Sequence, residues 1–200
     1  VLLFVEPRER IIRMRKHLPL VWTKNGPSGN RTVQLGTASR NEYFVFQIGI
    51  YAASTRVSWV DAEFTDLKGS VSGHIHNHRL SSPNLGGSDS RGAIFARNIS
   101  VEKGEVGVIF VGVNLTSHDL PQQYTGNLSL VVGIGDGTHL PMSVTYAIEL
   151  VPGPALVDRG DSDRTRLSRL RWLDSSVGLH NTSARRFAPL QLDVLSKTVS

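Results

Sequence analysis

The stretch that decides the fold is YTGNLSLVVGIGDGTHLPMSVTYAIEL at Tyr124–Leu150, two alternating segments joined by a glycine-rich turn. Six apolar side chains of the second segment fall on one face of a strand: Leu140, Met142, Val144, Tyr146, Ile148 and Leu150. Polar Ser143, Thr145 and Glu149 alternate with them, which predicts an antiparallel strand with one buried face and one face in water. Gly135-Asp136-Gly137 is typical of a hairpin turn rather than a phosphate-binding loop, because it lacks a lysine and leads into another strand.

Five segments upstream of this hairpin have the apolar alternation of strands: Tyr43–Tyr51, Val57–Phe64, Ser70–His78, Ala93–Val101 and Val106–Asn114. The first of them is largely apolar on both faces, which indicates a central strand covered from both sides. Short turns rich in Gly, Asn, Asp and Pro separate the segments. The pattern therefore predicts an all-β fold, an antiparallel β-sandwich.

The hydrophobic period changes after Pro152-Gly153-Pro154. Three leucines then recur at helical spacing, at Leu167, Leu170 and Leu173. Asp161 stands where a helix N-terminus favours a hydrogen-bond acceptor, so we expect one C-terminal amphipathic helix followed by an extended tail. We therefore divide the chain into a sandwich domain at residues 1–158 and a linking helix with its tail at residues 159–200.

Composition narrows the classes of function. The 200 residues include no cysteine, which excludes a disulfide framework, a thiolate metal site and a cysteine nucleophile. No apolar run approaches the roughly 20 residues of a membrane span, so no membrane span is predicted, and no cofactor is expected. The net charge of +5 comes from the arginine-rich segments Arg8–Lys16 and Arg159–Arg186. No nucleic-acid-binding motif accompanies these charges, so no nucleic-acid partner is predicted.

Five motifs follow one another in a characteristic order: EYFVFQIGIYA at 42–52, FTDLKG at 64–69, NLGGSDSRG at 84–92, YTG at 124–126 and RTRLSRLRWLDS at 164–175. Over about residues 40–178 the chain resembles the N-terminal β-sandwich domain of glycoside hydrolase family 123-like proteins, the β-N-acetylgalactosaminidase family. Residues 1–40 match that pattern poorly, and Phe110 stands where a tryptophan is common.

This resemblance implies a sandwich that precedes a catalytic (β/α)₈ barrel. In that family the acetamido group of the sugar attacks the bond, helped by an adjacent Asp-Glu pair on the barrel. This chain contains no Asp-Glu dipeptide and lacks the alternating strands and helices of a barrel. The resemblance therefore implies a non-catalytic accessory domain of a glycoside hydrolase acting on N-acetylhexosamine-containing glycans, whose partner is a missing C-terminal barrel of the same polypeptide.

The alternative is a stand-alone carbohydrate-binding or extracellular adhesion module. Trp59, Asp61 and Glu63 share one face of a predicted strand, where the indole could stack on a sugar ring; strand packing is the simpler interpretation. The same two carboxylates could span the separation a glycosidase needs, but a solvated strand face explains them better. Arg159-Gly160-Asp161 is the tripeptide that integrins recognise, although it also immediately precedes the expected helix.

The C-terminal helix carries an unusual density of arginine. We expect it to pack between the sandwich and the missing barrel, with at least one arginine paired to an acid, because the planar guanidinium suits bidentate carboxylate contacts. A solvated surface helix is the alternative. The residues predicted to lie between the domains are Arg164, Arg166, Arg169, Arg171, Trp172 and Asp174.

Asn-x-Ser/Thr sequons are more frequent than composition alone would give. They predict a secreted or extracellular glycoprotein, although no signal peptide is read in this chain. Asn114 and Asn127, near strand edges, are expected to be the most accessible. The five sites are Asn30, Asn98, Asn114, Asn127 and Asn181.

Three histidines alternate at His74, His76 and His78. On a strand they would share one face, about 6.6–7 Å apart, so two neighbours could hold one Zn²⁺ or Cu²⁺ ion. A third ligand from the same strand reaches less easily. Exposed surface histidines are the simpler interpretation, so no metal site is predicted, and this triplet is the candidate if a metal binds.

Overall fold

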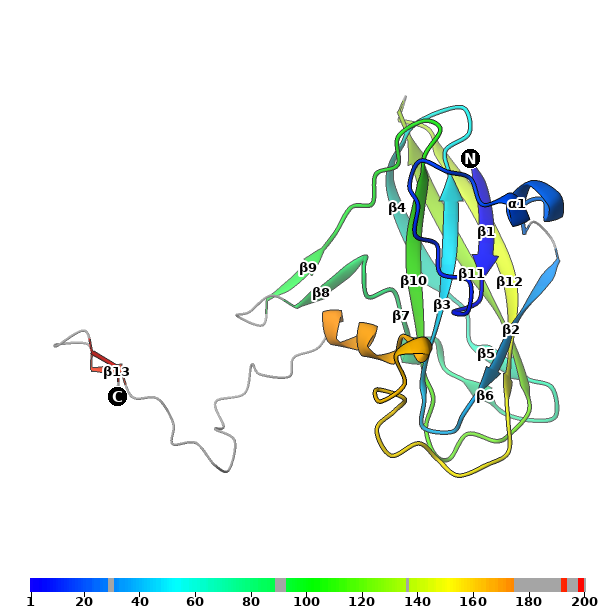
Figure 1. The fold of residues 1–200 in the computed structure, drawn as a ribbon, viewed down its shortest axis with the longest axis vertical. Coiled ribbons are helices and arrows are strands. Elements are labelled where there is room, and N and C mark those ends of the chain that lie inside the picture. Colours follow the sequence, from blue (N-terminus) through cyan, green and yellow to red (C-terminus); the bar gives the residue numbers. More distant parts are fainter. Residues whose placement is uncertain (29–30, 89–92, 136, 175–191, 194–197, 200) are drawn as a thin grey trace.

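The computed structural model describes residues 1–28, 31–88, 93–135, 137–174, 192–193 and 198–199 (Figure 1). Its elements in chain order are β1 (Leu2–Glu6), α1 (Leu20–Asn25), β2 (Thr32–Ala38), β3 (Tyr43–Tyr51), β4 (Val57–Phe64), β5 (Leu67–Gly69), β6 (His74–Ile75), the 3₁₀ helix η1 (Asn77–Arg79), β7 (Leu80–Ser81), β8 (Gly86–Ser88), β9 (Ile94–Ala96), β10 (Val106–Asn114), β11 (Gln123–Ile134), β12 (His139–Leu150), the 3₁₀ helices η2 (Arg164–Arg166) and η3 (Ser168–Asp174), β13 (Leu192–Asp193) and β14 (Thr198–Val199).

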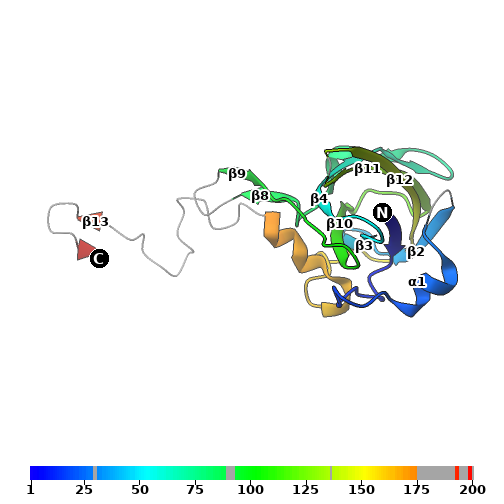
Figure 2. The same ribbon diagram turned by 90° about the horizontal axis from the view of Figure 1, so that it is seen from above.

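Two sheets enclose the core, which confirms the predicted β-sandwich (Figure 2). One sheet has the order β1-β3-β10-β7 and is antiparallel throughout. The other runs β2-β12-β11-β5-β6, and β4 also pairs with β11. The hairpin of β11 and β12 forms as predicted, and β3, β4 and β10 have the predicted bounds. One pair departs from the antiparallel pattern, because β2 lies parallel to β12.

The core lies between the inner faces of β3, β10, β11 and β12. Phe44, Phe46, Ile48 and Ile50 of β3 are fully buried in it. The outer face of the same strand is buried too, where Ile12 and Trp22 pack over Gly49. Trp22 stacks on Phe4 with ring centroids 4.1 Å apart, and its indole occupies the space where a Cβ on Gly49 would stand. The two-sided apolar pattern of residues 43–51 thus reflects two separate packing layers.

Two predicted strands were wrong in extent. Residues 70–78 do not form one strand: β5 turns back into β6, and the chain then enters η1. Val71 at that turn is 84% exposed, so its apolar side chain does not mark the buried face of a strand, as the sequence pattern had suggested. Within the segment 93–101, the strand β9 covers Ile94–Ala96, and Val101 forms an isolated bridge to Val57.

The C-terminal helix differs in kind from the prediction. It consists of two 3₁₀ helices, η2 and η3, separated by Leu167 in the left-handed region at φ 59°. Asp163, rather than Asp161, caps it by accepting the Thr165 N–H at 3.0 Å. Trp172, expected to pack, is 57% exposed, and Leu173 is also exposed. The predicted tail lies outside the described residues except at β13 and β14.

Replacing Tyr146 with phenylalanine should raise the free energy of unfolding by about 1 kcal/mol. Tyr146 is fully buried beside Phe46, and burial raises the pKa of its phenol above the usual value. Its hydroxyl has no hydrogen-bond partner among the described residues, so the variant removes an uncompensated polar group. Thermal unfolding should show a gain of about 2–4 °C.

Tyr124→Phe is the matched control, because the Tyr124 hydroxyl donates to the Leu120 carbonyl at 3.0 Å. That variant should lose stability. A Tyr146→Phe protein less stable than the parent would show that the hydroxyl is satisfied in solution.

Candidate functional site

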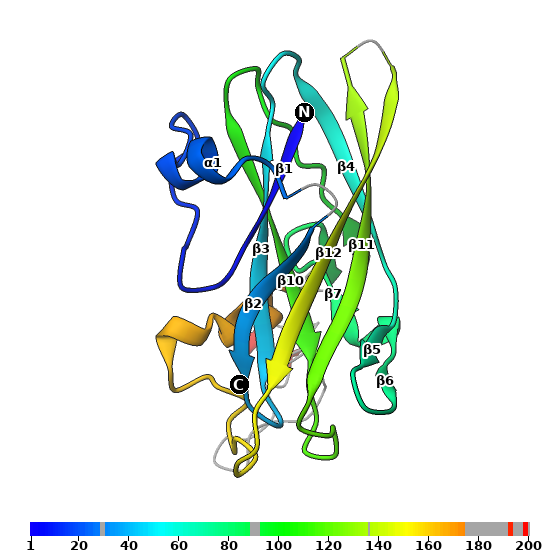
Figure 3. The same ribbon diagram turned by 90° about the vertical axis from the view of Figure 1, so that its right-hand side faces the viewer.

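A β-hairpin brings three metal-binding side chains to one place. Leu67 pairs with Ile75 across β5 and β6, and both are fully buried, so the residues that alternate with them point away from the core. Continuing that register sets Asp66 opposite His76, with His74 one diagonal step away. Figure 3 shows this hairpin beyond the end of β4, beside β11.

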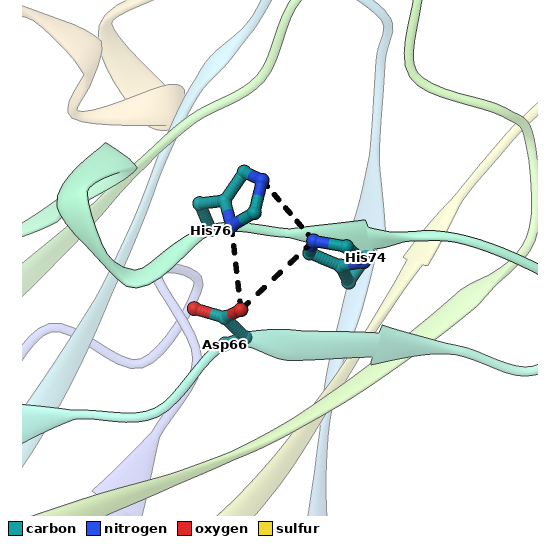
Figure 4. Close-up of side chains that lie close together, drawn as sticks. All are labelled: Asp66, His74 and His76. Atoms are coloured by element: carbon teal, nitrogen blue, oxygen red, sulfur yellow. Dashed lines mark hydrogen bonds and ion pairs between the residues drawn. The ribbon is translucent and has the colours of Figure 1, made fainter.

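The three side chains face one another (Figure 4). His76 Nδ1 lies 3.3 Å from Asp66 Oδ2, and His74 Nε2 lies 4.0 Å from the same oxygen and 3.1 Å from His76 Nε2. Asp66 Oδ1 accepts the backbone N–H of Asn77 at 2.7 Å. That hydrogen bond, aided by the two imidazoles, lowers the pKa of the Asp66 carboxyl below its usual value, so the group is ionised and acceptor-only near neutral pH.

The predicted histidine triplet is only partly brought together. His78 belongs to η1, and its ring stacks on His76 at 5.4 Å between centroids rather than joining the ligand cluster. Asp66 takes the third place instead. Sequence reasoning missed Asp66 because it stands eight residues before His74, and only the hairpin register places it there.

A buried carboxylate forms an ion pair with the C-terminal segment. Glu42 is fully buried at the start of β3, and its two oxygens receive the guanidinium groups of Arg8 and Arg166. The Arg166 contact measures 2.6 Å, and the Ser39 N–H donates to the same carboxylate at 2.8 Å. The expected arginine–acid pair therefore exists, but it joins η2 to the sandwich of this chain.

Of the other arginines in this segment, Arg169 and Arg171 bond to groups of this chain, whereas Arg164 is exposed. Arg171 forms a bidentate pair with Asp161, which lowers the pKa of that carboxyl, and Arg169 Nε donates to the Asp161 carbonyl at 2.9 Å. Arg164 is exposed, and the side chain of Asp174 is not described. A groove of about 240 Å³ lies along the segment. Its lining consists of Asp163, Arg164, Leu167, Ser168, Arg169, Leu170 and Leu173.

Trp59, Asp61 and Glu63 occupy alternate positions of β4, on its outer face. Both carboxylates are exposed. Trp59 packs across β11: its indole fills the space above Gly133 and meets the ring of His139 edge-on, with centroids 5.1 Å apart. The indole therefore has a packing role, and glycan binding by these three residues stays a prediction.

A pocket of about 360 Å³ beside α1 was not foreseen from the sequence. This volume falls at the lower end of the roughly 300–1,000 Å³ of ligand pockets. Glu6, Arg10 and Trp22 contribute polar atoms to it. Glu6 accepts the Trp22 indole N–H at 2.6 Å and lies 3.4 Å from Arg10, so these groups already partner one another.

The Arg159-Gly160-Asp161 tripeptide is folded into a turn. Asp161 is engaged by Arg171, Gly160 is buried, and Arg159 donates to the side chain of Asn114. The arginine and aspartate of the tripeptide are therefore both held by contacts within this chain, which removes the tripeptide as support for integrin recognition.

The sequons differ in accessibility. Asn98 is exposed in a loop before Val101, whereas Asn114 is half-buried and accepts a hydrogen bond from Arg159. Asn127 is exposed at a central position of β11, where its side chain accepts from Thr145 at 2.8 Å. Asn30 and Asn181 lie outside the described residues.

In a eukaryotic secretory host, Asn98 should therefore carry N-glycan at higher occupancy than Asn114, because its side chain is free of the Arg159 contact. Peptide mapping by mass spectrometry measures both occupancies. Asn98→Gln should remove one glycan from the intact mass. Higher occupancy at Asn114 than at Asn98 would contradict this ordering.

Comparison with known proteins supports the fold alone. No family model matches the chain, and no curated protein sequence matches it. Among solved structures, a family 123 glycoside hydrolase from Clostridium perfringens aligns with a TM-score of 0.51 and 12% identity, over 76% of this chain. The alignment covers 27% of that hydrolase, so this chain spans about a quarter of its length. The alignment thus shows a weak similarity of fold to this hydrolase, and nothing finer.

Two bacterial proteins show weaker similarity. MyfA, the major subunit of Myf fimbriae from Yersinia enterocolitica, aligns over 74% of this chain and 98% of its own, at 8% identity and a TM-score of 0.38. The CupB2 chaperone of Pseudomonas aeruginosa aligns over 68% and 60%, at 11% identity and 0.39. Neither similarity bears on function. Among the described helices, none is long and apolar enough to cross a membrane.

Proposed function

We propose that this chain is the non-catalytic sandwich domain of a larger secreted glycoside hydrolase acting on N-acetylhexosamine-containing glycans. The observation that carries this proposal is the alignment with the family 123 hydrolase, which covers most of this chain and about a quarter of the enzyme. The five sequons support a secretory route. The absence of an Asp-Glu dipeptide supports a non-catalytic role.

The C-terminal segment supplies the contact with the rest of the polypeptide in this proposal. Arg166 and Arg171 are paired with acids within the chain, so the available surface is the end of η3, where Trp172 and Leu173 are exposed and Leu173 lines the groove. Exposed tryptophan is a typical anchor of protein interfaces. The occupant of this surface is the remainder of the same polypeptide.

Two assays test the proposal. The 200-residue chain should not hydrolyse aryl N-acetylgalactosaminides, whereas a longer polypeptide containing a barrel should. Turnover by this chain that Asp61→Asn or Glu63→Gln abolishes would refute the non-catalytic role. Trp172→Ser should lower the melting temperature of the longer polypeptide but leave this chain nearly unchanged, because an exposed side chain contributes about 0.5 kcal/mol or less. Equal shifts in both would exclude an interdomain contact.

A carbohydrate-binding module is the second candidate, favoured by the pocket beside α1. Calorimetric titration of this chain with N-acetylgalactosamine-containing glycans distinguishes it. Millimolar or tighter binding that Arg10→Ala weakens, with Glu149→Ala as an exposed control, would favour the module over the accessory domain.

A further inference from the structure

We propose that Asp66, His74 and His76 form a surface site for a divalent transition-metal ion such as Zn²⁺. The inference is independent of the proposed function. Two imidazoles and one carboxylate are ligands that zinc accepts. Nitrogen ligands also favour Zn²⁺, Cu²⁺ and Ni²⁺ over Ca²⁺ and Mg²⁺, which prefer oxygen.

The spacing of the donor atoms suits one ion. Bonds of 2.0–2.1 Å in a tetrahedron require donors about 3.3–3.4 Å apart. His74 Nε2 and His76 Nε2 are 3.1 Å apart, and Asp66 Oδ2 lies 4.0 Å from His74 Nε2. One donor atom from each residue lies within 4.8 Å of the other two. His76 presents Nε2 to His74 and Nδ1 to Asp66 (Figure 4), so its exposed ring has to turn for one nitrogen to face an ion shared with both partners.

The carboxylate is already oriented for binding. Asp66 Oδ1 is engaged by the Asn77 N–H, which leaves Oδ2 turned toward both histidines. Hydrogen bonds of this kind hold metal ligands in their binding geometry and lower the cost of assembling the site. Asp66 lies in the break between β4 and β5, outside the residues that either strand pairs with β11.

The hairpin that carries the ligands is itself held in place. Its two inward residues, Leu67 and Ile75, are fully buried. At its turn the Gln122 side chain accepts the N–H groups of Val71 and Ser72 at 2.8 and 3.2 Å, and donates to the Ser72 carbonyl at 2.6 Å. The β5–β6 hairpin that carries the ligands is therefore fixed to the rest of the sandwich, although the ligand side chains themselves are 41–55% exposed.

Three protein ligands leave a fourth position open to solvent. Such a position holds water or accepts a donor from another molecule. Lys68, opposite His74 in the hairpin, is exposed, and its flexible stem lets its ammonium stay in water away from the ion. The site is thus built to bind zinc at the surface, not to enclose it.

Isothermal titration of the 200-residue chain with ZnCl₂ tests the proposal. The chain is purified with a histidine-free tag, because a polyhistidine tag would bind the same ions. One equivalent of Zn²⁺ should bind, and Asp66→Asn and His74→Ala should each weaken binding about tenfold or more. Asn at position 66 keeps an oxygen for the Asn77 N–H, so the loop geometry is preserved. Millimolar Ca²⁺ should not compete.

Matched controls are His78→Ala, which removes the neighbouring ring, and His118→Ala, which removes an exposed histidine elsewhere. Both should bind Zn²⁺ like the parent chain. Substitution with Co²⁺ reports the coordination independently, because a low-coordinate site absorbs visible light far more strongly than the hydrated ion. No saturable Zn²⁺ binding would overturn the proposal, as would equal affinity in the parent and His74→Ala proteins. A loss with His78→Ala as large as that with His74→Ala would overturn the ligand assignment.

Discussion

Replacing Glu42 with alanine is expected to lower the free energy of unfolding by about 3–5 kcal/mol, because it leaves the buried Arg8 guanidinium with only the exposed Glu9 as a counter-charge. The carboxylate is fully buried and receives two guanidinium groups, from Arg8 and Arg166. Arg8 is itself 8% exposed and lies over the ring of Phe44 at 4.8 Å, so it cannot turn to water without disturbing the core.

The effect should extend beyond the local contact. Arg8 belongs to the N-terminal segment and Arg166 to η2, so Glu42 joins both ends of the described sandwich to the start of β3. Loss of the carboxylate should therefore loosen the C-terminal segment before the sheets open. Hydrogen exchange at the amides of 163–172 should accelerate in the variant more than exchange within β11.

Chemical denaturation measures the stability change, and Glu149→Ala is the matched control. Glu149 is an exposed glutamate on β12, so its removal should change stability by about 0.5 kcal/mol or less. Glu42→Gln should fall between the two, because it keeps hydrogen-bond acceptance but removes the charge. A Glu42→Ala protein as stable as Glu149→Ala would show that the cluster contributes no net stability.

Gly112→Ala should be the second most damaging of these changes, at about 1–3 kcal/mol, the usual cost of overpacking. The Tyr43 ring lies directly over Gly112 in β10, and an added Cβ would overlap the phenol oxygen. Tyr43 is buried, and its hydroxyl bonds to Ser81 Oγ at 2.9 Å. The ring must therefore move, and that hydrogen bond is disturbed with it.

The matched control is Gly135→Ala, at the hairpin turn between β11 and β12. An added Cβ there meets no atom within 4 Å, and the residue has no positive φ, so its stability should be unchanged or slightly higher. Thermal unfolding of both variants measures the difference. If Gly112→Ala unfolds at the temperature of Gly135→Ala, the sheet absorbs the methyl group without cost.

Much of the sandwich was predictable because strand alternation is a local property. The side chains from Leu140 to Leu150 occupy alternate faces wherever the strand goes, so their burial pattern follows from the sequence alone. The tight connection between β11 and β12 likewise reflects residue types that favour chain reversal. Alternation does not indicate which strands pair with one another, however, and the parallel pairing of β2 with β12 was not predicted.

The C-terminal segment shows where local pattern failed. Leu167, Leu170 and Leu173 have helical spacing, yet the chain forms two 3₁₀ helices with Leu167 in the left-handed region. Contacts distant in sequence accompany this geometry. Arg166 reaches Glu42, 124 residues away, which no periodicity within the segment could reveal.

The sequence by itself determined the all-β class, the β11–β12 hairpin, the two-sided burial of β3 and the types of residue available for chemistry. Only the tertiary structure decided which of those residues meet. Asp66 joins His74 and His76 because β5 pairs with β6 in one register, and shifting that register by one residue would turn the side chains to the opposite face. Propensity and alternation act between near neighbours, whereas register and docking depend on which distant surfaces exclude water together.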